Sequence, residues 1–139
     1  MLDLSSLLRT LQLYAHHAHH ICGRVVFNQD HAMLAEIYTK AETDYDNVIE
    51  RFIGLKGEEA LDESKVLMVA CQKVQALPMK GVKENKELLK ACLDLITQIN
   101  EKIEPLCKDP KTTQGTLQML GNIADLNEVI VYKLKQRLK

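Results

Sequence analysis

Histidine is the residue type whose placement in this chain most clearly indicates chemistry. All five histidines lie near the start of the sequence and none follows position 31; they are His16, His17, His19, His20 and His31. Acidic side chains, including Asp46 and Glu50, follow a little further along. Imidazole nitrogen and carboxylate oxygen together suit Fe(II), Zn(II) and Mn(II). The pattern therefore favours a divalent-metal site over a set of incidental surface histidines, although the ligand types alone leave the metal open.

Helical spacing indicates which of these residues could share a site. At about 100° per residue, His31 and Asp46 lie within roughly 60° of each other beside the apolar stripe of their helix, and Glu50 lies about 40° beyond Asp46. On the preceding helix, His19 lies nearest the apolar stripe and His16 lies one turn earlier on the same side. These side chains flank the core without entering it. A metal held there would be enclosed only if a second subunit covered it.

Other polar residues of the same stretch are expected to face solvent. His17 points away from the apolar stripe of its helix. Glu36, Glu42 and Asp44 are interpreted as an ordinary solvated helix face. Cys22 lies within the apolar stripe, so core packing is a better interpretation for it than a Cys/His metal site.

Apolar periodicity predicts the elements that would position these residues. No stretch alternates apolar and polar residues over the length of a strand, so we expect an all-α fold in a single domain, residues 1–139. Four long amphipathic helices, with one short helix in a wide connection, favour a ferritin-like four-helix bundle with a long crossover. The predicted helices run from near Leu4 to about Val26, from before Leu34 to near Gly54 and Gly57, from Glu59 to Leu77 before Pro78, from about Lys83 to Leu106 with Pro105 and Pro110 closing it, and from Thr112 or Thr113 to the end.

Composition argues against several classes of function. Hydrophobic residues make up 46% of the chain and aromatic residues only 4%, which suits a helical core of aliphatic side chains. A net charge of -1 gives no general attraction to nucleic acid. No apolar run is long enough for a membrane span and no basic segment precedes an apolar one as in a signal peptide, so we expect a cytoplasmic protein. The four cysteines form no CxxC pair, which indicates reduced thiols.

Several segments of the first two predicted helices resemble the signature of the Dps-type miniferritins. They are His19-His20, the Phe27 that follows, the run from His31 to Tyr38, and the run from Asp46 through Glu50-Arg51 to Gly54. In that family a histidine on the first helix precedes by twelve residues a histidine that opens the second, and Asp-x-x-x-Glu-Arg and a glycine follow. The resemblance covers these two helices closely and the remainder of the chain loosely.

The resemblance implies a function as well as a fold. By this likeness His19 and His31 would bind iron from one subunit, and Asp46 and Glu50 would bind it from a two-fold partner. Ferrous iron would be oxidised there by oxygen or a peroxide, and ferric iron would be stored inside a homododecameric shell, with no organic cofactor. No Gly-rich phosphate loop or nucleophile elbow supports another catalytic class.

The sequence departs from the family pattern at two positions. Ala35 stands where the family has an aspartate ligand, and His20 stands where it often has a tryptophan. His16 or His20 could replace the missing oxygen ligand with nitrogen. Such a histidine-rich centre would also accept zinc as a substitute for iron.

Two further expectations concern partners and alternatives. We do not expect DNA binding, because the first ten residues hold one Asp and one Arg, and the cations of the last turns, Lys133, Lys135, Arg137 and Lys139, suit the dipole of a helix C-terminus. The alternative function is a non-catalytic helical assembly or partner-binding protein with an incidental or different divalent-metal site. An intrasubunit metal hydrolase is a further alternative, against which the lack of any histidine after His31 counts.

Overall fold

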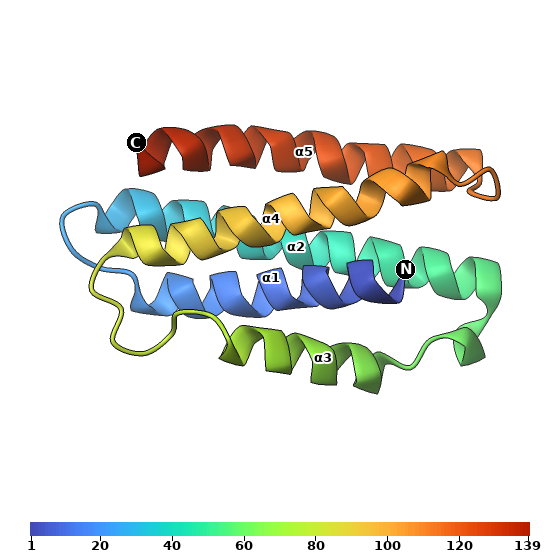
Figure 1. Ribbon diagram of the computed structural model, residues 1–139, viewed down its shortest axis with the longest axis horizontal. Helices are drawn as coiled ribbons and strands as arrows, with labels where there is room; N and C mark the ends of the chain where they lie inside the picture. The colour runs from blue at the N-terminus through green and yellow to red at the C-terminus, as the bar shows by residue number, and fades with distance from the viewer.

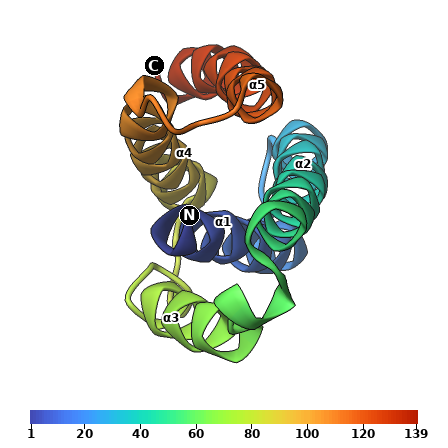
Figure 2. The same ribbon diagram turned by 90° about the vertical axis from the view of Figure 1, so that its right-hand side faces the viewer.

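The computed structural model describes residues 1–139 and is entirely helical, as predicted (Figure 1). Figure 2 shows α1, α2, α4 and α5 around a common centre, with α3 on the opposite side of α1. The connection that contains α3 carries the chain back along the bundle, so α2 and α4 run in the same direction (Figure 1). The elements are α1 (Leu2–Ile21), α2 (Phe27–Lys56), the 3-10 turn η1 (Glu58–Ala60), α3 (Glu63–Gln75), α4 (Asn85–Lys108) and α5 (Gln114–Leu138).

One hydrophobic core fills the space between the helices, and α1 packs against three other helices. The predicted stripe of α1, from Leu4 to Ala18, is buried against α2 and α4 on one side, and α3 covers part of its other side. By contrast, α3 buries only Val66 and Ala70 within its own span. The short helix therefore covers the bundle and is not one of its four members, as the sequence predicted. None of the helices combines the length and the apolarity that crossing a bilayer would require.

The turn between α1 and α2 fixes how the two helices face each other. The first helix was predicted to reach Val26, but it ends at Ile21, because Cys22 is extended and Arg24 has a left-handed φ of 71°. Asn85, at the start of α4, holds this turn from the side. Its side chain accepts a hydrogen bond from the Gly23 amide at 3.0 Å and donates one to the Gly23 carbonyl at 2.6 Å.

The other helix ends agree with the predictions in part. Thr113 caps α5 by accepting a hydrogen bond from the Thr116 amide at 3.2 Å, which confirms that predicted start. The fourth helix was predicted to end near Leu106 with Pro105 and Pro110 closing it, and α4 ends two residues later, at Lys108. Pro105 therefore lies inside the last turn, and Pro110 follows the end of the helix. The short helix begins at Glu63, four residues later than predicted, after η1 and an N-cap from Asp62.

Polar side chains connect α2 to α5. Asp30 is fully buried and accepts two hydrogen bonds from Arg137, at 2.9 and 3.0 Å. About three turns further along α2, Lys40 donates to Asn127 at 2.8 Å and pairs with Asp44. Asp44 was predicted to lie on a solvated face, but it is 93% buried, because α5 covers this side of α2. Arg137 faces the buried Asp30 carboxylate and is not a freely exposed cation.

Candidate metal centre

The turn after α1 brings the two histidines of the family pattern into direct contact. His19 lies in the last turn of α1 and His31 near the start of α2, on antiparallel neighbouring helices. The His19 Nδ1 atom lies 2.9 Å from the His31 carbonyl oxygen, and the two imidazole rings stack with centroids 3.6 Å apart. Both side chains are half-buried. Residues that are twelve positions apart in the sequence therefore form one unit at the end of the hairpin.

The hydrogen bond of His19 prepares its other ring nitrogen for a metal. A carbonyl oxygen can only accept, so Nδ1 of His19 carries the proton and donates it, and Nε2 keeps its lone pair. Metal-binding histidines commonly donate their second ring N–H to a backbone carbonyl in this way. For His31, desolvation, and then the neighbouring His19 and His20, hold the pKa below its usual 6.5. A lowered pKa favours the neutral imidazole of His31, which is the form that binds metals.

Four more rings extend the cluster. His16 stacks on Tyr38 of α2 with centroids 4.2 Å apart and lies 4.6 Å from His20. Phe27 lies 4.8 Å from His31. His16 and His20 are exposed, and His17 makes none of these ring contacts. The placement of His16 beside His19, with His17 outside the cluster, agrees with the helical spacing.

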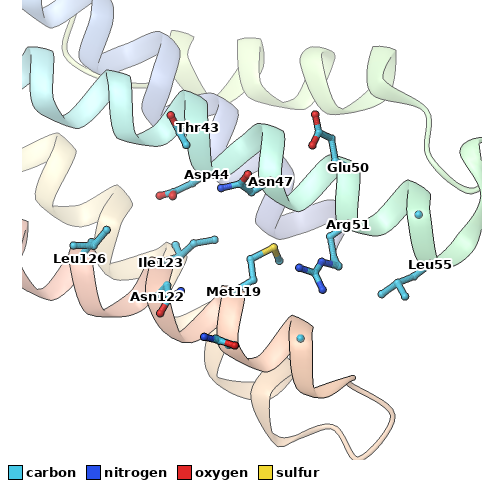
Figure 3. A pocket seen from close by; sticks show the side chains of 13 residues that line it. Thr43, Asp44, Asn47, Glu50, Arg51, Leu55, Met119, Asn122, Ile123 and Leu126 are labelled. Atoms are coloured by element: carbon cyan, nitrogen blue, oxygen red, sulfur yellow. The ribbon is translucent and has the colours of Figure 1, made fainter.

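The two predicted carboxylate ligands lie elsewhere on α2. Asp46 and Glu50 are exposed, and fifteen residues separate His31 from Asp46, which on a continuous helix corresponds to about 22 Å. Figure 3 shows the Glu50 side chain pointing away from α5. Within one chain, no three His, Cys, Asp or Glu side chains converge where they could hold a metal ion. The histidines and the carboxylates of one chain are therefore not brought together.

Ala35 occupies the position at which the family pattern has an aspartate ligand. Ala35 lies one turn after His31, is half-buried, and offers no ligand atom. The neighbouring Glu36 is exposed and accepts a hydrogen bond from Lys133 of α5 at 3.0 Å. Neither residue supplies an oxygen ligand to the histidines, so the cluster of a single chain contains only nitrogen ligands.

A groove lies between α2 and α5 and contains none of the histidines (Figure 3). Its volume is about 770 Å³, and Arg51 points across it toward α5. Gly115 makes room for Arg51, because a Cβ atom there would lie 2.8 Å from the guanidinium Nη1. Burial raises the pKa of Asp44 in the groove wall, against the opposing effect of Lys40. No feature of the sequence predicted this groove, since it depends on the packing of two helices distant in the chain.

No family model, no curated protein and no solved structure matches the chain. The likeness to the Dps-type miniferritins therefore depends on the residue pattern of α1 and α2 alone.

Proposed function

We propose that this chain is a subunit of a ferritin-like, Dps-type assembly that binds ferrous iron between two subunits and oxidises it. The observation that carries the proposal is the pair His19 and His31. One ring is oriented by a backbone carbonyl, with its Nε2 free, and the other ring is in contact with it at the edge of the bundle. Asp46 and Glu50, at the spacing of the family pattern, would complete the centre from a two-fold partner.

The straight course of α2 makes such sharing geometrically simple. If two copies of α2 lie antiparallel across a two-fold axis, each residue faces one equally far on the other side of the axis. The midpoint of α2 between His31 and the two carboxylates falls near Thr39, which is exposed. An axis there would bring His31 of one chain to Asp46 and Glu50 of the other, and the same contact would occur twice.

Exposed apolar side chains around the histidines support a covered site. Ile21 is 38% exposed and Phe27 is 40% exposed, and both flank the turn that joins α1 to α2. Apolar side chains exposed beside one another are typical of interaction sites. A second subunit on this side would bury these groups together with the metal.

The proposed ligands fit the chemistry of iron oxidation. Two imidazole nitrogens and two carboxylates accept Fe(II), and the carboxylate oxygens favour the harder Fe(III) product. Two ferrous ions give one electron each to one hydrogen peroxide, which takes up two protons and leaves as two water molecules. Because Ala35 supplies no ligand, coordination positions remain for water or the oxidant. Zinc could occupy the same ligands without being oxidised. The ferric product would be stored within an oligomeric shell, for which the family resemblance implies twelve subunits.

The ring centroids of His16 and His19 are 6.4 Å apart, which is long for two ligands of one ion. The proposed centre therefore has four protein ligands: His19, His31, Asp46 and Glu50. His16 as the replacement for the missing aspartate stays a prediction of the sequence.

Complementation between two inactive variants tests whether the centre is shared. Both His31→Ala and Glu50→Ala should abolish rapid iron oxidation, followed by ferric absorbance after anaerobic loading and addition of peroxide. When the two variants are co-expressed in equal amounts, about half of the dimers are mixed and each mixed dimer holds one intact site. About one quarter of the wild-type activity should then return.

The control is the double variant His31→Ala/Glu50→Ala co-expressed with His31→Ala, in which no pairing gives an intact site. Retained helical content and assembly mass establish that the losses are local. If complementation restores nothing although mixed assemblies form, the ligands are not shared as proposed. Full oxidation rates in both single variants would rule out these ligands as the site of iron oxidation.

A further inference from the structure

We propose a second metal site, formed by His16 and His20 of a single chain, that binds late transition metals such as Cu(II), Zn(II) and Ni(II). The two residues are four positions apart on α1, so their side chains project from the same side of the helix one turn apart. Their ring centroids are 4.6 Å apart and both side chains are exposed. This site goes beyond the proposed iron centre and needs no residue of that centre.

Coordination geometry supports this pair. A metal bonded to an imidazole nitrogen at about 2.0 to 2.1 Å lies about 3.2 Å from the centroid of that ring. Two rings on one metal, at bond angles between right-angled and tetrahedral, therefore have centroids about 4.5 to 5.2 Å apart. The observed 4.6 Å between His16 and His20 falls within this interval. The spacing of the two rings is therefore compatible with one shared metal ion.

The other histidine pairs do not meet the same condition. His19 and His31 stack at 3.6 Å, closer than two ligands of one ion, so their rings must separate when metal binds. His16 and His19 are 6.4 Å apart, which places a shared metal almost on the line between them. His19 and His20, at 5.8 Å, would need an angle well above the tetrahedral value.

The residues around His16 and His20 affect both how strongly the pair binds a metal and which metals it prefers. Tyr38 stacks on His16 at 4.2 Å and limits the motion of that ring, which lowers the entropy lost on binding. Neither histidine forms an ion pair with a carboxylate. Two nitrogen ligands with water in the remaining positions favour metals late in the divalent series, with Cu(II) above Ni(II) and Fe(II). The pair is therefore expected to discriminate against ferrous iron.

Metal titrations of matched variants test the proposal. Full-length protein at neutral pH is titrated with Zn(II) or Cu(II) against a chromophoric competitor, and Cu(II) is also followed by electron paramagnetic resonance. His16→Ala and His20→Ala should each lower the affinity of this site at least about tenfold, because a lost ligand costs at least as much as a lost supporting contact. The spectrum should change from two coordinated imidazole nitrogens to one. His17→Ala is the matched control and should change nothing.

The Glu50→Ala variant separates this site from the proposed iron centre. It should leave the His16 and His20 site intact, whether or not iron oxidation is lost. If Glu50→Ala removes this zinc and copper binding as fully as His16→Ala does, the pair is not an independent site. Equal small losses in all three histidine variants, His17→Ala included, would show a diffuse surface chelator and would also overturn the proposal.

Discussion

The contact between Asp30 and Arg137 offers the sharpest test of how the bundle is held together. The Asp30 carboxylate is completely buried, and Arg137 donates to both of its oxygens from the last turn of α5. The Asn85 amide donates to the same carboxylate at 2.9 Å. The interaction joins the start of α2, one residue before His31, to the end of the chain. Replacing Arg137 with alanine should therefore destabilise the end of the bundle that carries the histidines.

The expected magnitude follows from what is left behind in the variant. Removing one partner of a buried ion pair costs about 3 to 5 kcal/mol, because the remaining charge stays desolvated without compensation. The Arg137 side chain is 22% exposed and Asn85 keeps its hydrogen bond, so water and one donor remain near Asp30. We therefore expect a loss near the lower limit, about 3 kcal/mol. For a chain of this length that corresponds to a fall in Tm of about 12 °C.

Thermal and urea unfolding of Arg137→Ala measure this loss, with Lys133→Ala as the matched control. Lys133 lies one turn earlier on α5 and pairs with Glu36, but both side chains are more than 40% exposed, so its removal should cost about 1 kcal/mol or less. The double variant Asp30→Asn/Arg137→Ala should recover part of the loss, since no buried charge is then left unpaired. Equal small effects of Arg137→Ala and Lys133→Ala would refute the conclusion that the buried carboxylate depends on Arg137.

Three further outcomes follow from burial and exposure. Cys71 is exposed, whereas burial raises the pKa of Cys92 to about 12. A thiol reagent at mildly alkaline pH should therefore modify Cys71 in the folded protein and Cys92 only after unfolding, as measured by mass spectrometry of the modified peptides. Burial raises the pKa of Asp44 above 3.8 despite the opposing effect of Lys40, so folding favours the protonated carboxyl. The contribution of Asp44 to stability should therefore fall as pH rises through that raised pKa, and a pKa below 3.8 in a carboxyl NMR titration would show that Lys40 dominates instead. Light scattering at micromolar concentration should find an assembly, and a monomer of 15.8 kDa would contradict the proposed interface.

The helical plan of this chain could be predicted because its apolar periodicity is strong and its helices are long. The stripe of α1 and the Thr113 cap of α5 are local signals, and both are present in the structure. The errors lie where local signals mislead. Arg24 adopts a left-handed conformation that would ordinarily indicate glycine, and Pro105 lies inside the last turn of α4, where a proline would ordinarily end the helix.

The candidate site was predictable only as far as helical spacing reaches. Spacing placed His16 beside His19 and turned His17 away from both, and the structure agrees. The burial of Asp30 and Asp44 was missed, because α5, which covers both carboxylates, is distant from α2 in sequence. Asp30 lies in the first turn of α2, where an acidic residue ordinarily complements the helix dipole, and its partner Arg137 is 107 residues away. Such a pair becomes visible only when the packing of α5 against α2 is known.

Because α2 is long, only one of the two proposed metal sites should depend on assembly. A continuous helix cannot fold back, so Asp46 and Glu50 of one chain stay about 20 Å or more from His31 of that chain, whatever the side chains do. A centre that uses both groups can therefore form only when a second copy is present, and its occupancy must fall on dilution together with the assembly. His16 and His20 lie on consecutive turns of one helix and need no partner. Their metal affinity should be independent of protein concentration, so a dilution series followed by both copper binding and iron oxidation distinguishes a site built by the fold from one built by association.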